Sequence, residues 1–199
     1  TGYAGIELGL KRVIPNLRTV AYVEVEAFAI ANLVNKMETG QMVPAPVWTD
    51  LKTFDPKPFR DCVDIITGGY PCQPFSAAGN RKGKDDPRHL WPFIKRIVHE
   101  CQPRQVFFEN VEGHLSLGIS EVLEDLEKMG YQSEVGIFSA VEVGAMHERK
   151  RVFILANFNS SGPSRLFEFN NEVGDTPPRT ETKKCMFSVG AQAIKSEKW

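Results

Sequence analysis

The feature that most constrains the fold is a regular alternation of short apolar runs with longer segments of helical spacing. Four runs, at residues 19–25, 64–69, 105–111 and 151–157, are rich in β-branched and aromatic residues and are too short to be helices. Near-continuous apolar character of this length is typical of strands buried on both faces of a parallel sheet. The runs therefore predict the core strands of one sheet.

Three segments between these runs, at 27–37, 90–101 and 119–131, carry apolar residues at the spacing of amphipathic helices. Alternating strands and helices predict an α/β fold with a doubly wound, Rossmann-like, mostly parallel sheet and right-handed crossovers. We expect this domain to span residues 1–158. Residues 159–199 are polar, rich in turn formers and weakly periodic, and predict a short irregular C-terminal region.

Composition excludes several classes of protein. Lys and Arg number 24 against 25 Asp and Glu, a net charge of -1, which argues against coating nucleic acid by bulk charge but leaves room for a local basic surface. No apolar run could span a bilayer and no secretory signal opens the chain, so we expect a cytoplasmic protein without a membrane partner. The four cysteines lack the spacing of a zinc site, and we expect neither a structural metal nor disulfides.

One cysteine stands apart from the other three. Cys72 lies in GGYPCQPFS, residues 68–76, where two glycines follow a predicted strand and prolines bracket a rigid turn. This position places Cys72 at the carboxyl edge of the sheet, where α/β folds bind ligands. Its loop favours a nucleophile, which becomes competent when a nearby positive charge stabilises the thiolate. A buried apolar thiol is the better interpretation for Cys62, Cys101 and Cys185.

Polar residues at other strand ends point to a nucleotide. Gly2 and Gly5 precede a predicted helix, where backbone can approach an anionic ligand. Glu24 ends the next strand about twenty residues later, where nucleotide-binding folds place an acid against ribose hydroxyls. Asp50 follows a further predicted strand. A tight turn or a solvated carboxylate explains each residue singly, whereas together they predict an adenosine site.

Two further strand ends carry charge. Glu109 ends the very apolar strand QVFFENV, and a carboxylate there is costly unless it is paired or used in chemistry. Arg149 and Arg151 alternate at the start of a strand and so should point to the same face. Both an exposed basic strand end and two guanidinium groups facing one cleft fit this pattern.

Taken in chain order, these segments resemble the motifs of the cytosine-C5 DNA methyltransferases. TGYAG resembles the cofactor loop of that family, YVEVE its ribose-binding acid segment and WTDL the loop that contacts adenine. PCQPFS resembles the catalytic loop, ENV the glutamate motif and HERKR the arginine motif. The resemblance covers residues 1–156. Ala4 replaces a family glycine, and Met146 and His147 stand where Pro and Gln are commoner.

The resemblance implies a DNA (cytosine-5-)-methyltransferase of the modification type that uses S-adenosylmethionine, releases S-adenosylhomocysteine and needs no metal. It implies that Cys72 attacks C6 of a flipped-out cytosine while Glu109 holds N3 and the exocyclic amine. Arg149 would contact the base carbonyl, Arg151 would support the site, and Asn110 would brace the cysteine loop. The cofactor-binding residues that it implies are Gly2, Tyr3, Ala4, Gly5, Glu24, Val25, Asp50, Leu51, Gly69, Pro71 and Leu90.

The implied partner is double-stranded DNA containing a target cytosine, together with a cognate restriction endonuclease system. Residues 76–91 resemble the loop that closes over DNA, although an ordinary surface loop fits them too. The implied DNA-binding residues are Gln73, Ser76, Arg81, Lys82, Lys84 and Arg88. Residues 159–199 would form a reduced target-recognition region and tail, in which 188–194 resembles the last family motif. We expect a monomer in a bacterial or phage-infected cell, associated with the nucleoid.

Other functions remain open at this point. TGYAG is typical of a loop that follows a strand, and no such strand precedes it in this sequence; with the short C-terminal region, this fits a truncated or inactive homologue that binds cofactor or DNA without turnover. A transfer-RNA cytosine-C5 methyltransferase would carry the same motifs. A nicotinamide-dependent oxidoreductase is a weaker alternative, because its chemistry needs neither PCQPFS nor ENV.

Overall fold

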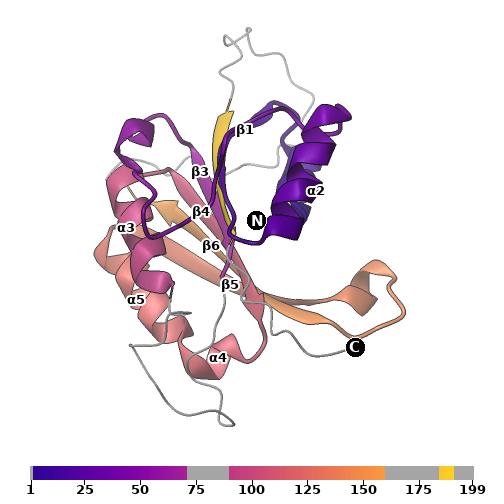
Figure 1. Ribbon diagram of the computed structural model, residues 1–199. Coiled ribbons are helices and arrows are strands. Elements are labelled where there is room, and N and C mark those ends of the chain that lie inside the picture. Colours follow the sequence, from indigo (N-terminus) through magenta and orange to yellow (C-terminus); the bar gives the residue numbers. More distant parts are fainter. Residues whose placement is uncertain (1, 71–89, 160–183, 191–199) are drawn as a thin grey trace, which may run out of the picture.

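The strands form a single sheet with helices on both faces. The computed structural model describes residues 2–70, 90–159 and 184–190, and its seven strands lie in the order β2-β1-β7-β3-β4-β6-β5 (Figure 1). The strands are β1 (Leu17–Val23), β2 (Val47–Trp48), β3 (Ile65–Gly69), β4 (Gln105–Val111), β5 (Tyr131–Ser139), β6 (Lys150–Phe158) and β7 (Lys184–Gly190).

The pairing of these strands makes the sheet mostly parallel. β2, β1, β7, β3 and β4 pair parallel to one another, whereas β6 is antiparallel to both β4 and β5. α3 and α5 lie on one face of the sheet and α2 on the other (Figure 1), which confirms the predicted doubly wound α/β fold. The helices are α1 (Gly5–Val13), α2 (Ala27–Glu38), α3 (Trp91–Cys101), α4 (His114–Leu117) and α5 (Ile119–Lys128), with 3-10 turns η1 (Lys57–Phe59) and η3 (Ala140–Val143).

The larger core lies between the sheet and the face covered by α3 and α5. Ile94 and Ile97 of α3 and Leu126 of α5 are fully buried against Ile66 and Phe108 of the central strands. Each such side chain stabilises the fold by about 1.5–3 kcal/mol when it leaves water. The apolar spacing of α3 and α5 therefore fixes which face of each helix meets the sheet.

The predicted core strands are confirmed, and one prediction near them is wrong. The strand at 105–111 is β4 itself, and β1, β3 and β6 agree with their predicted ranges to within about two residues. Tyr131 is the last residue of the predicted helix at 119–131 but begins β5, because α5 ends at Lys128 and Gly130, with φ 91°, turns the chain toward the strand. A side chain there would be strained, and its Cβ would lie 3.1 Å from the ring of Phe158.

Part of the predicted irregular C-terminal region belongs to the sheet. Lys184–Gly190 forms β7, which pairs with β1 on one side and β3 on the other and so lies among the central strands. The buried Ser188 hydroxyl donates to Glu7 Oε1 of α1, so a polar residue is tolerated in this strand. Residues 160–183 and 191–199 lie outside the described residues, and a domain boundary at 158 stays a prediction.

No helix in the described part of the chain combines the length and the apolar character that crossing a membrane requires.

Candidate active site

The topology brings the predicted site residues to one edge of the sheet. β1, β2, β3 and β4 run parallel, so Glu24 just after β1, Asp50 two residues after β2, Gly69 at the end of β3 and Glu109 near the end of β4 lie toward their shared carboxyl edge. β6 is antiparallel to β4, and the register pairs Val111 with Arg151, so β6 begins at the edge where β4 ends. This edge is where open α/β sheets bind ligands.

The N-terminal loop adopts a conformation suited to close approach of a ligand. Gly2 and Ala4 have φ of 53° and 62°, and α1 begins directly afterwards at Gly5. The backbone strain at Ala4 costs about 1–2 kcal/mol for a residue other than glycine. Its fully buried methyl group packs against Tyr22 and Leu33, which offsets part of that cost.

Glu24 is the fixed acid of this edge. Its side chain is fully buried, and its two oxygens accept hydrogen bonds from the backbone N–H groups of Gly2 at 2.7 Å, Val25 at 2.9 Å and Glu26 at 3.1 Å. Charge-assisted bonds of this kind hold a carboxylate in one orientation and offset the cost of its burial. Glu24 therefore ties the glycine loop to the end of β1.

Exposed apolar side chains occur on the segments next to Glu24. Tyr3 and Val25 are exposed, as are Phe28, at 72% of its surface, and Trp48 at the end of β2. The rings of Tyr3 and Phe28 meet edge to face with centroids 6.2 Å apart. Large apolar groups beside a buried acid suit a ligand with a flat heterocycle and a sugar. Sequence reasoning missed Phe28 and Trp48, although neither occupies a core position of its helix or strand.

Three other predicted cofactor residues have surroundings that do not by themselves indicate a ligand. Asp50 is exposed, and its Oδ1 accepts a hydrogen bond from Lys52 N at 2.8 Å in a tight turn after β2. Leu51 is buried in the core, and Leu90 is half-buried against it. Their assignment to cofactor binding stays a prediction.

The predicted acid and one of the two predicted arginines form an ion pair. Arg151 Nε lies 2.6 Å from Glu109 Oε1, with the two side chains 22% and 25% exposed. Arg149, just before β6, has an exposed side chain. A Cβ added at Gly69 would lie 3.0 Å from Glu109 Oε2, so the carboxylate sits directly over this glycine. The arrangement holds an acid in a fixed position while its face toward solvent remains accessible.

Asn110 connects this strand to the start of the cysteine loop. Its Nδ2 donates to the carbonyl oxygen of Tyr70 at 3.0 Å, and its Oδ1 accepts from Val111 N at 2.9 Å. Tyr70 is the last described residue before the loop and lies two positions before Cys72. The contact agrees with the bracing role predicted for Asn110.

Sequence reasoning missed the partner of the Tyr70 side chain. The Tyr70 hydroxyl lies 3.1 Å from His114 Nε2, and both residues are buried. Asn110 belongs to β4, and His114 begins α4 four positions later. A single histidine in ENVEGH carries no periodic signal that would have identified it. His114 Nδ1 has no hydrogen-bond partner within the described residues.

The burial of His114 should make the protein acid-sensitive. Burial lowers the pKa of His114 from 6.5 to about 4, so the unfolded chain takes up this proton more readily than the folded protein does. The contribution of neutral His114 to the free energy of unfolding is therefore fully present above about pH 6.5. It is lost as the pH drops toward 4, by on the order of 3 kcal/mol. Urea unfolding from pH 7 to pH 4 should show this loss in wild type and a shallower one in His114→Gln. If the free energy of unfolding fell equally with pH in both proteins, the acid sensitivity could not be assigned to His114.

The segment that carries the cysteine lies outside the described residues. Pro71 and Cys72 belong to it, as do the predicted DNA-binding residues Gln73, Ser76, Arg81, Lys82, Lys84 and Arg88. Tyr70, just before it, and Trp91, two residues after it, are in ring contact with centroids 5.8 Å apart. The described residues on either side of it are therefore close together.

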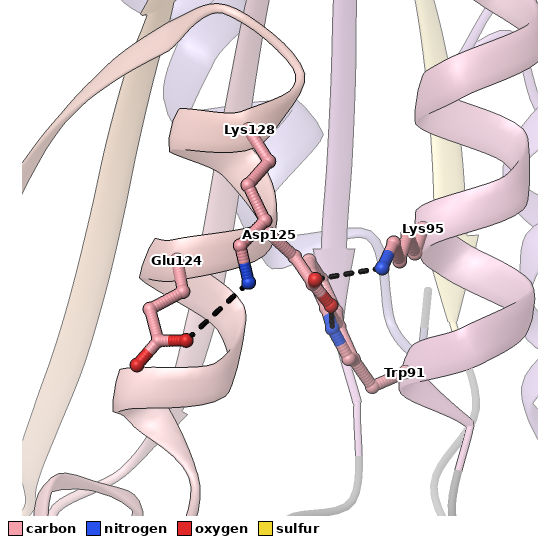
Figure 2. A network of polar contacts seen from close by, with 5 residues as sticks. All are labelled: Trp91, Lys95, Glu124, Asp125 and Lys128. Atoms are coloured by element: carbon pink, nitrogen blue, oxygen red, sulfur yellow. Dashed lines mark hydrogen bonds and ion pairs between the residues drawn. The ribbon is translucent and has the colours of Figure 1, made fainter.

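The start of α3 is anchored to α5. Trp91 Nε1 donates to Asp125 Oδ2 at 2.9 Å, and Lys95 Nζ lies 2.6 Å from Asp125 Oδ1; the three side chains converge in Figure 2. Burial acts to raise the pKa of Asp125, but the hydrogen bonds from Lys95 and Trp91 outweigh it and hold that pKa below its usual value. The ionised carboxylate thus fixes the indole at the start of α3.

No group of three or more His, Cys, Asp or Glu side chains that could hold a metal ion occurs within the described ranges. The donor set of this edge, a fixed acid with backbone amides and aromatic rings, suits an organic nucleotide.

Known proteins show the same combination of fold and motifs. The family model described as C-5 cytosine-specific DNA methylase matches residues 1–199. The Type II methyltransferase M.NgoMIV of Neisseria gonorrhoeae is 29% identical over all of this chain and 60% of its own length. M.CviJI of Paramecium bursaria Chlorella virus IL3A is 30% identical over 92% of this chain and 50% of its own length. The chain thus spans between half and two thirds of these two relatives.

Solved structures agree in fold. A DNMT2 mutant of Spodoptera frugiperda superposes with a TM-score of 0.66 over 97% of this chain and 53% of that one, at 19% identity. The Dnmt2 methyltransferase of S. pombe gives 0.65 over 87% and 56%, at 24% identity. These likenesses confirm the methyltransferase type of α/β fold. Because the family model matches the whole sequence, the chain belongs to the C-5 cytosine-specific DNA methylases.

Proposed function

We propose that the protein transfers a methyl group from S-adenosylmethionine to C5 of a cytosine in duplex DNA. The observation that carries this proposal is the Glu109–Arg151 ion pair, 2.6 Å long, on the strand beside β3. β3 leads through Tyr70 to Cys72 two residues later, so an acid and a thiol belong to neighbouring strand ends. A C5 methylation needs both, because C5 of cytosine becomes nucleophilic only after a thiolate has added to C6.

The protein residues account for the covalent step. The Cys72 thiolate forms a bond to C6 while the C5–C6 double bond opens, and N3 of the base is protonated with the support of Glu109. C5 would then take the methyl group, as the S–CH₃ bond of S-adenosylmethionine breaks and S-adenosylhomocysteine is left. Loss of the C5 proton to a base returns an electron pair to the C5–C6 bond, N3 gives up its proton, and Cys72 leaves as a thiolate. Arg151 keeps Glu109 oriented, and Arg149 would bind the base carbonyl.

The residues around Glu24 fit the cofactor. Glu24 would accept from the ribose hydroxyls, Val25 would lie against the adenine, and Asp50 would bind near its amino group. The exposed rings of Tyr3 and Phe28 would add apolar surface next to Val25. S-adenosylmethionine, when bound, would supply the methyl group as an electrophile. The remaining cofactor assignments, from Gly69, Pro71 and Leu90, rest on the family resemblance.

The proposal includes the partners of such an enzyme. Duplex DNA would be read with the help of the predicted phosphate-contacting residues between Gln73 and Arg88, and a cognate restriction endonuclease would share its target. The proposed setting is the cytoplasm of a bacterial or phage-infected cell, at the nucleoid, with the protein as a monomer. The names of the two curated relatives, both Type II methyltransferases, support the restriction–modification setting.

The covalent chemistry gives a direct test. Purified protein is incubated with tritiated S-adenosylmethionine and either cytosine-containing duplex DNA or transfer RNA. A parallel sample receives DNA containing 5-fluorocytosine, whose C5–F bond blocks release of the enzyme. We expect label in DNA and an adduct that peptide mapping assigns to Cys72. Binding of cofactor without label or adduct would favour a non-catalytic homologue, and label in RNA alone would overturn the DNA substrate.

Gly69→Ala should impair the reaction more than it impairs folding. The new methyl group would lie 3.0 Å from Glu109 Oε2 and push the carboxylate away from its place beside Arg151. Overpacking of this kind costs about 1–3 kcal/mol, which corresponds to roughly a 5- to 160-fold loss of kcat if all of it falls on the site. Gly9→Ala is the matched control, because nothing lies within 4 Å of its added Cβ. Its kcat should equal that of wild type, and the same kcat for Gly69→Ala would contradict the prediction.

A further inference from the structure

We propose that Tyr70 and His114 act as a positioning pair, which fixes the point where the chain leaves β3 toward Cys72. This inference rests on the proposed function and deepens it. Tyr70 follows β3 directly and is 6% exposed. Its carbonyl oxygen accepts from Asn110 Nδ2 at 3.0 Å, and its hydroxyl is hydrogen-bonded to His114 Nε2 at 3.1 Å. One residue is thus held at its backbone and at the far end of its side chain.

The ring of Tyr70 is held as firmly as its polar ends. Its centroid lies 5.8 Å from Trp91 of α3, 5.8 Å from Phe108 of β4 and 5.5 Å from His114 of α4. The contacts with Phe108 and His114 are edge to face, a favourable arrangement for aromatic pairs. Three separate elements therefore surround the residue from which the cysteine loop starts.

The hydrogen bond is not needed to fill this space. A phenylalanine would occupy the same aromatic surroundings as Tyr70, without a buried hydroxyl that requires a partner. Burial of the His114 imidazole also carries a cost, shown by the lowering of its pKa to about 4. The hydrogen bond between the two side chains fixes the orientation of Tyr70, because it prevents the ring and the attached backbone from turning. A reaction that needs a thiol at one place benefits from such fixing.

A second buried tyrosine serves as a structural comparison. Tyr131 donates its hydroxyl to the carbonyl oxygen of Pro103 at 2.7 Å and is 4% exposed. It begins β5, and Pro103 precedes β4, so this bond lies at the edge of the sheet opposite to Glu109. Tyr131→Phe removes a comparable bond without touching the candidate site.

Two readouts together test the pair. The first is the single-turnover rate of methyl transfer at saturating DNA and cofactor. Tyr70→Phe and His114→Leu should each lower this rate about fivefold, as expected for loss of one hydrogen bond. The double variant should be no slower than the slower single variant, because both changes remove the same bond. His114→Gln, whose amide reaches a similar position, should restore most of the rate, and Tyr131→Phe should leave it unchanged.

The second readout needs no activity. Hydrogen exchange followed by mass spectrometry measures opening of the peptide that contains Tyr70 and Cys72. Its amides should exchange about fivefold faster in Tyr70→Phe and His114→Leu, and at the wild-type rate in Tyr131→Phe. Unchanged exchange in the first two variants, or faster exchange without slower methyl transfer, would overturn the positioning role. A wild-type protein that transfers no methyl group would overturn the proposed function, while exchange would still decide whether the pair holds this exit.

Discussion

Replacing Glu109 with glutamine is expected to lower kcat for methyl transfer by about 10²- to 10⁴-fold, the range typical of losing a positioned acid. Glutamine has nearly the same shape and still offers an oxygen to Arg151 Nε, which lies 2.6 Å from the carboxylate. It cannot support protonation of N3 in the way that a carboxyl group does. The effect should therefore fall on kcat, with the affinity for S-adenosylmethionine close to that of wild type. Steady-state kinetics and calorimetric titration separate the two quantities.

The control for this change lies three residues further along the chain. Glu112 is exposed, and its Oε1 lies 3.9 Å from Lys150 Nζ in a loose surface ion pair. Such pairs contribute little to stability, and Glu112→Gln should keep kcat within about twofold of wild type. A Glu109→Gln variant that retained more than about a tenth of wild-type kcat would show that another group performs the proton chemistry.

The sequence predicts the buried half of this fold better than its periphery. β4 and α3 are recognisable because each buries a continuous apolar surface, which leaves a clear period in the sequence. β5 was missed because it pairs only with β6 at one end of the sheet, and exposed residues such as Val135 and Ile137 give it no alternation. A strand with one partner and a largely solvated face leaves a weak pattern.

The place of β7 depends on distant parts of the chain. Its segment, KCMFSVG, is a short apolar run inside a polar, turn-rich region, and β1 and β3 offer it two strand edges whose backbone hydrogen bonds do not depend on side-chain type. The buried Ser188 finds its partner in Glu7, 181 residues away in sequence. Local composition cannot show a contact of that range.

In the candidate site, too, the sequence predicts some features and not others. Strand-end residues such as Glu24 and Glu109 could be assigned from the order of motifs, because parallel strands bring their carboxyl ends together. The partner of each side chain could not be assigned in this way. That Arg151 rather than Arg149 pairs with Glu109, and that His114 meets Tyr70, are results of strand register and of the turn after β4.

Glu24→Gln is expected to weaken cofactor binding and destabilise the fold together. The two carboxylate oxygens accept three backbone N–H groups, and a glutamine must turn an NH₂ group toward at least one of these donors. An unsatisfied buried donor costs about 1–3 kcal/mol, measurable as a lower free energy of unfolding in urea. Because Gly2 is one of the three donors, the glycine loop should loosen, and the Kd for S-adenosylmethionine should rise at least about tenfold.

The comparison with Glu26→Gln distinguishes this mechanism from a general effect of charge. Glu26 lies two residues away, carries the same charge and makes no side-chain cap to α2. Its replacement should leave both stability and cofactor affinity near the wild-type values. Equal losses in the two variants would mean that net charge at this edge governs binding. A weaker Kd for Glu24→Gln without any loss of stability would mean that the carboxylate acts on the cofactor alone, and that its bonds to the backbone are dispensable for the loop.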